Sequence, residues 1–370
     1  MGYRYLDGMK TSVWPRLSSQ ENGGRSVENE ADEEQPAVVP SFHSEAAPMA
    51  AVSGFTFMQP FHERRIQSSA CLKRQELIAR RSTRQREQIE WSDAEKSAFE
   101  AEWYHNQLEW IESIHQICGE PIDWERLAAL ASPFRRGEIG PHERQAEADF
   151  ADYKPTRMQK LLKQDAAVKQ ELQDQIVLAK EKDQQEYTEW RRLTDFARDI
   201  LEGNRTAYLR VLEEIAPLED LLALGSGLEY NVLNSAAVEV ELDVNSGEII
   251  PHESKILNET GELSRSRLSK EDYHELERKY VCGSVIRIGH ELFALLPLET
   301  VLIHARDTKV NLETGQEEYV TVLSIRFERS AVPEMDLAQE ACPQLLAHFE
   351  HHIRYDASTG FDPVEKLSRP

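Results

Sequence analysis

The sequence predicts an α+β protein in which long charged helices precede a compact C-terminal domain with a small mixed or antiparallel sheet. Two observations carry this prediction. Apolar residues recur every three or four positions over much of 92–201, as on one face of an α-helix. After residue 225 the period changes to two, the pattern of a half-buried strand. We therefore expect a disordered tail over 1–60, a charged helical region over 61–202 and an α+β domain over 203–370.

Charge and composition limit the classes of function. The net charge of −23 opposes attraction of the whole molecule to nucleic acid or to an anionic membrane. The cysteines are far apart, which indicates reduced thiols and argues against a disulfide framework or a thiolate zinc site: they are Cys71, Cys118, Cys282 and Cys342. The first residues lack the apolar run of a signal peptide, and no stretch has the ~20 apolar residues of a membrane span. We expect a soluble, cytoplasmic protein without a membrane partner.

The segment Arg64–Arg86 is a basic exception in this acidic chain. Residues 61–90 contain eight Arg and Lys against four Glu, a local charge of 8 − 4 = +4. Such a segment can neutralise the phosphates of nucleic acid. Alternatively, its arginines pair with the acidic helices beside them.

Two helical stretches follow the basic segment. Ser92 and Glu95 have the spacing of a capping box and predict a helix that runs to Cys118, and Asp123 caps a short helix that ends near Leu130. Residues 155–201 resemble one long charged helix with a single apolar stripe. That stripe fits either a parallel coiled coil or an antiparallel hairpin packed against 92–118. We therefore expect self-association or a protein partner through helices 92–202.

The remaining elements alternate between helix and strand. A helix is expected over 205–215, followed by strands over 238–244 and 248–256 that a turn at 245–247 joins into a hairpin. Residues 228–233 fit a further strand. Ser269 caps a helix to residue 296, strands follow over 300–305 and 319–327 across a turn at 314–315, and a last helix runs over 335–355.

The first hairpin carries the clearest constellation of chemical groups. In the predicted register, period-two geometry places acidic residues and one lysine on the same face: Glu239, Glu241, Asp243, Glu253 and Lys255. Carboxylates that hold Mg²⁺ beside a lysine are the arrangement of restriction-type nucleases. Pro251 departs from the pattern because it removes a donor from the supposed catalytic strand. The alternative is a solvated face with one cross-strand Glu–Lys pair.

A histidine pair lies in the last predicted helix. His348 and His352 are four residues apart, so on a helix they share a face and offer two ligands to a transition metal. A third ligand has to come from elsewhere, for example His304, Asp307 or Cys342. The alternative is a pair of solvated histidines near a helix C-terminus. No cofactor is expected otherwise.

Motifs of common enzymes are absent from the sequence, which contains no GxSxG, P-loop or GxGxxG. Residues 100–367 resemble a group of uncharacterised bacterial cytoplasmic proteins. The segments that carry the resemblance are Pro121–Trp124, Pro217–Asp220, Leu292–Pro297 with the strand after it, Thr314-Gly315, Gly360-Phe361 and Val364-Glu365. The resemblance implies that the helical region and the α+β domain belong together, and it implies no activity or site residue.

Two functions fit these observations. The first is a non-catalytic interaction or scaffold protein that acts through its helical region. The alternative is a divalent-metal-dependent nuclease that uses the 237–256 hairpin, with Glu239, Asp243, Glu253 and Lys255 as its site.

Overall fold

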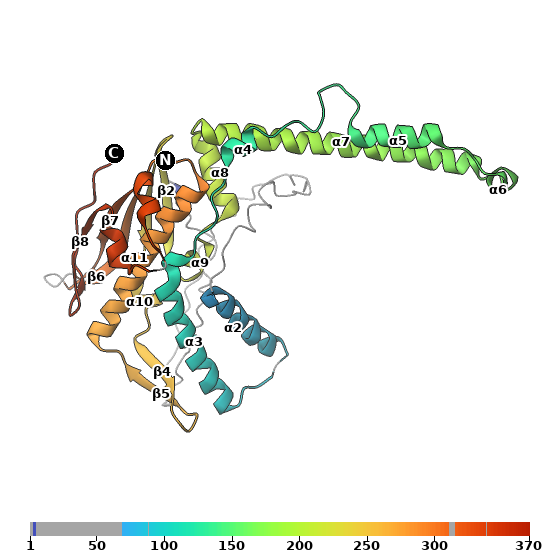
Figure 1. Cartoon of the computed structure of the whole chain (residues 1–370). Coiled ribbons are helices and arrows are strands. Elements are labelled where there is room, and N and C mark those ends of the chain that lie inside the picture. The colour runs from blue at the N-terminus through green and yellow to red at the C-terminus, as the bar shows by residue number, and fades with distance from the viewer. Residues whose placement is uncertain (1–2, 5–68, 88, 311–314, 338) are drawn as a thin grey trace, which may run out of the picture.

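A computed structural model describes residues 3–4, 69–87, 89–310, 315–337 and 339–370 and confirms the α+β class. A body holds the sheet, and an arm of helices projects from it (Figure 1). Apart from Tyr3 and Arg4, the predicted tail over 1–60 lies outside the described residues, as do Arg64, Arg65 and Thr314.

The body is built on a mixed sheet of six strands in the order β1-β2-β3-β6-β7-β8. β3 and β6 are parallel, whereas the other neighbours are antiparallel. The strands are β1 (Tyr3–Arg4), β2 (Gly227–Asn234), β3 (Ala237–Asp243), β6 (Thr300–Val310), β7 (Glu317–Glu328) and β8 (Glu350–Ile353). Two small sheets pair β4 (Glu253–Leu257) with β5 (Leu263–Arg267) and β9 (Tyr355–Asp356) with β10 (Gly360–Phe361).

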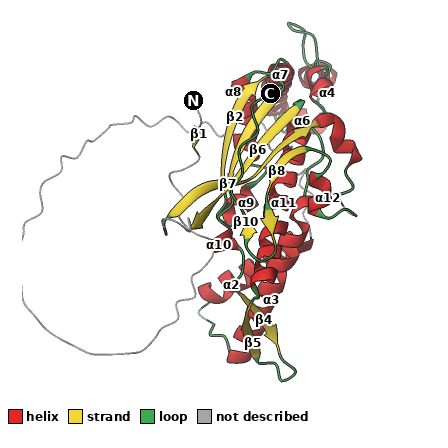
Figure 2. Ribbon diagram, turned by 90° about the vertical axis from the view of Figure 1, so that its left-hand side faces the viewer, coloured by secondary structure: helices red, strands yellow, loops and turns green. Residues whose placement is uncertain are grey.

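The helix α11 (Lys270–Leu295) lies along one face of this sheet and provides the crossover that the parallel pair requires (Figure 2). The Ser269 hydroxyl accepts the N–H of Asp272 at 3.0 Å, so the predicted helix start is confirmed. Close packing depends on Gly289, where a Cβ atom would lie 2.8 Å from the Phe327 ring on β7. Valine and isoleucine side chains of β3 and β6 that face α11 are fully buried.

The hairpin predicted over 237–256 is wrong, although its first strand is confirmed as β3. Asn245 adopts a left-handed conformation with φ of 51°, and the chain then forms the helical turn α10 (Ser246–Ile249). The next strand, β4, pairs with β5 in a separate sheet. The partners of β3 are β2 and β6, because their apolar side chains complete the core against α11.

The helix predicted over 335–355 is also wrong. A 3-10 helix, η2 (Arg329–Glu334), and the short helix α12 (Cys342–Leu346) precede β8. Pro343 lies at the start of α12, and a proline has no N–H with which to continue a helix that began at 335. Phe349 is buried with its ring 4.6 Å from that of Phe327, and the chain then pairs with β7.

Helices α2 (Ser69–Arg86) and α3 (Asp93–Ser113) pack against each other in the body. The predicted capping box is confirmed, since the N–H of Ser92 donates to Glu95 at 2.9 Å and that of Glu95 to the Ser92 hydroxyl at 3.3 Å. The 3-10 helix η1 (Ile114–Gln116) ends this stretch, and α3 continues into the core through Trp110 against Tyr280 of α11. One apolar core therefore includes side chains from both sides of residue 202, and the domain division stays a prediction.

The arm consists of α4 (Trp124–Ala128), α5 (Pro141–Asp152), α6 (Arg157–Leu161) and α7 (Asp165–Leu201). The prediction of one helix over 155–201 is wrong at its start, because Lys163 has a φ of 55° that separates α6 from α7. The stripe of α7 does belong to a hairpin, but its partners are α5 and α4 rather than 92–118. Helices α8 (Arg205–Ile215), as predicted, and α9 (Glu219–Ala223) lead back to the sheet.

Candidate interaction surfaces

The four residues of the predicted nuclease site do not come together. Glu239 and Asp243 lie on β3 of the main sheet, whereas Glu253 and Lys255 lie on β4. The Lys255 ammonium is 3.1 Å from Glu100 of α3, and Glu253 lies opposite Arg267 of β5. The predicted site does not form, because residues 248–256 do not pair with β3.

The β3 carboxylates instead belong to a polar row on the sheet face that points away from α11. Asp243 accepts from Arg306 of β6 at 2.7 Å, and Glu239 accepts from Arg369 at 2.7 Å. Burial opposes ionisation of Glu239, but hydrogen bonds from Arg369 and Asn231 outweigh it, so the pKa of Glu239 lies below its ordinary value. These carboxylates are therefore occupied by cations of the chain itself.

The predicted metal pair also separates. His348 follows α12 and lies 3.0 Å from Glu340, and His352 lies on β8 with Nδ1 2.8 Å from the carbonyl of Glu365. The three suggested third ligands are in the body core: His304 beside Ser324, Asp307 beside Ser246, and Cys342 beside His115. Without a helix over 335–355, the two histidines share no helical face.

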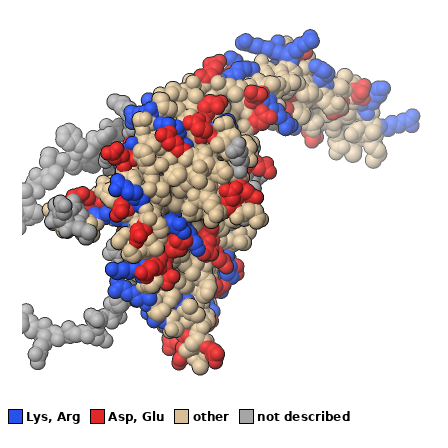
Figure 3. Space-filling view, turned by 60° about the vertical axis from the view of Figure 1, so that its left-hand side comes forward, with Lys and Arg blue, Asp and Glu red and all other residues tan. Residues whose placement is uncertain are grey.

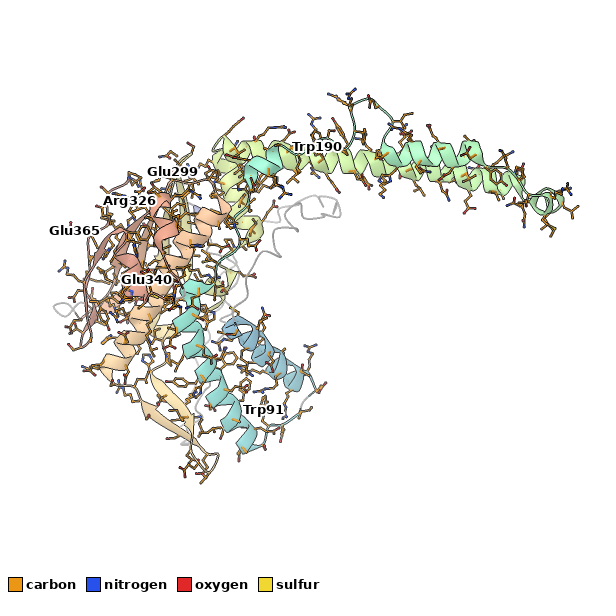
Figure 4. The ribbon with its side chains drawn as sticks, viewed as in Figure 1. Trp91, Trp190, Glu299, Arg326, Glu340 and Glu365 are labelled. Atoms are coloured by element: carbon orange, nitrogen blue, oxygen red, sulfur yellow. The ribbon has the colours of Figure 1, made fainter. Side chains whose placement is uncertain are left out.

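Four cations of α2 contact α3: Lys73, Arg74, Arg80 and Arg84. Lys73 and Arg80 both bind Glu102, at 2.6 and 2.5 Å, and Arg84 binds Glu95 at 2.5 Å. The guanidinium groups of Arg80 and Arg84 also lie over aromatic rings of Phe99 and Trp91, the latter labelled in Figure 4. The sequence left two alternatives for the basic segment, nucleic-acid binding and pairing with acidic helices. In the described part of the segment, Lys73, Arg80 and Arg84 pair with acidic side chains of α3.

One group in the arm has the composition of a metal site. His142, Asp183 and Glu186 offer ligand atoms that all lie within 4.8 Å of one another. Their hydrogen bonds give them a structural role, because Asp183 accepts the N–H groups of His142 and Glu143 at the start of α5. Glu186 in turn lies 3.0 Å from His142 Nε2. The group fastens α5 to α7.

Aromatic residues fix the root of the arm to the body. The Trp124 indole donates to the Leu295 carbonyl at the end of α11 at 2.7 Å, and its ring packs 6.0 Å from that of Phe196 on α7. Farther out, Trp190 donates to the Leu130 carbonyl at 2.9 Å (Figure 4). The buried side chains of α7 are all between residues 183 and 200, so the outer part of the helix lies outside the core.

The end of the arm exposes large apolar side chains. A capping box between Thr156 and Gln159 starts α6, and the side chains of Met158, Leu161 and Leu162 are then 65%, 78% and 57% exposed. We call residues 154–163 the arm tip. Its exposed cations Lys154, Arg157 and Lys163 contrast with the acidic chain as a whole. Figure 3 shows Lys and Arg side chains along the arm, among acidic ones, and some of them lie at its far end.

Sequence reasoning missed both the arm tip and α5. The capping box at Thr156 was a signal for a helix start inside the stretch predicted as continuous, and Gly140-Pro141 was a signal for the start of α5.

No family model, curated protein or solved structure matches the chain. The resemblance to uncharacterised bacterial proteins therefore stays a prediction. Among the helices of the described residues, none is long and apolar enough to cross a bilayer.

Proposed function

We propose that this protein is a non-catalytic interaction protein whose arm holds an apolar, cationic tip against an acidic protein surface. The exposure of Met158, Leu161 and Leu162 at the end of the arm is the observation that carries the proposal. Large exposed apolar side chains grouped at one place are typical of binding surfaces.

The physical chemistry of the tip favours a protein partner. Burial of an exposed leucine or methionine contributes about 1.5–3 kcal/mol each, so three of them are enough for a specific contact if the surrounding charges agree. Lys154, Arg157 and Lys163 flank the apolar group. Cations at the rim of an interface steer association toward an acidic surface and exclude a basic one.

The construction of the arm supports the same proposal. α7 contains 37 residues and is therefore about 55 Å long, at 1.5 Å per residue. The described side chains of α5 are all at least partly exposed, so the outer hairpin adds little to the core. Among the described residues, this long, thin hairpin joins the body at its root, and such a hairpin is suited to reach another molecule.

The nuclease alternative and nucleic-acid binding by α2 gain no support from the geometry. The first requires Glu253 and Lys255 beside β3, and the second requires cations that α3 already binds.

Site-specific photo-crosslinking in the source cells tests the proposal. A benzophenone amino acid replaces Leu161 in the full chain, and Ile256 on β4, which is 52% exposed, serves as the matched control position. We expect one defined protein adduct from position 161 that is missing from position 256. Reversal of the tip charges by Arg157→Glu with Lys163→Glu should abolish this adduct while the circular dichroism spectrum is unchanged.

Two results would overturn the proposal. One is an adduct pattern from position 161 that is the same as from position 256. The other is an adduct that persists undiminished after charge reversal, because an acidic partner surface should then repel the tip.

A further inference from the structure

The segment 362–370, which we call the strap, lies on the sheet face opposite α11. It has no regular secondary structure, and Leu367 is its buried side chain. It begins beside β8, where the N–H of Asp362 donates to the Arg354 carbonyl at 3.0 Å, and it crosses toward β3. Glu365 of the strap and Arg326 of β7 are labelled in Figure 4.

The surface under the strap is polar although it is buried. His304 on β6 is 1% exposed, Ser324 on β7 is 0% exposed and Glu239 on β3 is 8% exposed. A sheet face that only completes a core is apolar, as the α11 side of these strands is. Buried polar groups require hydrogen-bond partners, and the strap supplies such partners to Ser324 and Glu239.

These groups form one connected polar row that ends on a peptide N–H. The Leu367 N–H donates to the Ser324 hydroxyl at 2.9 Å, and that hydroxyl lies 2.9 Å from His304 Nδ1. His304 Nε2 lies 3.5 Å from the Glu239 carboxylate. Because the Ser324 hydroxyl accepts the Leu367 N–H, its own proton is left for His304 Nδ1, and loss of that N–H removes one hydrogen bond from the buried hydroxyl.

The other contacts also recognise an extended peptide. The Arg326 guanidinium donates to the Ser368 carbonyl at 2.7 Å, and the Val364 N–H donates to the Thr321 carbonyl at 2.9 Å. Lys366 binds Glu241 at 2.5 Å and Arg369 binds Glu239 at 2.7 Å. The face thus engages the peptide backbone, one aliphatic side chain and two cations.

We propose that this sheet face is a docking site for an extended peptide in which an aliphatic residue lies between two cationic ones, and that the strap occupies it in cis. Charge complementarity argues for this occupant, because β3 presents Glu239 and Glu241 to the two cations.

The ion pairs that hold the strap are accessible to solvent, since the side chains of Lys366 and Arg369 are 41% and 63% exposed. A hollow of about 330 Å³ beside the strap, lined by His352, Val364 and Glu365 among others, leaves room next to it. The strap and a peptide from another chain therefore compete for one site.

Competition between the strap and a free peptide tests this proposal. The full chain carries Lys366→Glu with Arg369→Glu to release the strap, and the probe is a fluorescein-labelled peptide with the sequence of residues 362–370. We expect binding to this variant by fluorescence anisotropy and, in the wild-type chain, an affinity at least about tenfold weaker. Hydrogen exchange at Val364 and Leu367 reports whether the strap has left. The exchanged pair Lys366→Arg with Arg369→Lys is the matched control, and it should bind no more peptide than the wild type.

Three results would overturn the proposal. The first is a released strap, shown by fast exchange at Leu367, without peptide binding. The second is equal binding of a probe peptide in which glutamates replace both cations, because recognition would then be independent of charge. The third is slow exchange at Leu367 in the charge-reversed chain, because the two ion pairs would then not hold the strap. None of these measurements depends on the arm.

Discussion

The start of α5 is capped by one carboxylate of α7, and removal of this carboxylate should open the arm locally. Gly140 precedes α5 and supplies no capping side chain. Asp183 of α7, which is 2% exposed, replaces it by accepting the N–H groups of His142 at 3.2 Å and Glu143 at 2.8 Å. Even the backbone is adapted to this contact, since a Cβ atom at Gly140 would lie 2.2 Å from the Asp183 carboxyl group.

The magnitude follows from the loss of two capping hydrogen bonds. Removal of a helix N-cap costs about 0.5–2 kcal/mol, and the negative charge at the helix start adds to the loss. For Asp183→Ala we expect about 1–2 kcal/mol, equivalent to a roughly 5- to 30-fold increase in the population with α5 detached. Because the described side chains of α5 are not buried in the core, this opening should stay local.

Hydrogen exchange measured by mass spectrometry is the appropriate assay. The amides of α5 should exchange roughly 5- to 30-fold faster in Asp183→Ala, while those of α11 keep their wild-type rates. Glu181→Ala, an exposed acidic position on the same helix, is the matched control and should leave α5 unchanged. Unchanged exchange in α5 of the Asp183 variant, or equal acceleration in α11, would refute the reasoning, because the carboxylate would then not be the local cap.

Two further perturbations test the core of the body. Arg287 of α11 is 2% exposed and forms a bidentate pair with Asp220 at 2.6 and 2.7 Å, so Asp220→Ala should lower the free energy of unfolding in urea by about 3 kcal/mol. Adding Arg287→Met should recover part of this loss, and a double variant no more stable than the single one would contradict the explanation. Burial lowers the pKa of three histidines, His115, His290 and His304, below 6.5. For His304, the positive charge of Lys366 lowers the pKa further. The folded state then binds fewer protons than the unfolded one, so stability is present above pH 6.5 and is lost as the pH falls through the lowered pKa values. Urea titrations between pH 7 and 5 should show this decline with a smaller slope in His304→Gln, and a stability independent of pH would exclude the mechanism.

Local patterns in the sequence determined where several elements begin. Ser92 and Ser269 cap the helices predicted for them, and Asp123 accepts the N–H of Arg126 at 2.8 Å as expected. The alternation of valine and glutamate also predicted β3. These features depend on residues that are at most a few positions apart, so a short stretch of sequence is enough to predict them.

Only the tertiary structure decided which elements meet. The period-two pattern of β3 fits any partner strand, and the choice of β2 and β6 over 248–256 comes from the core that they complete with α11. The same holds for α7, whose stripe is compatible with several partners and whose actual partners are α5 and α4. The nuclease hypothesis depended on such a pairing and was lost with it, whereas the metal hypothesis was lost with the helix predicted over 335–355. The site under the strap was gained in the same way that the predicted sites were lost. Ser324, His304 and Glu239 are far apart in sequence and come together only through the register of three strands.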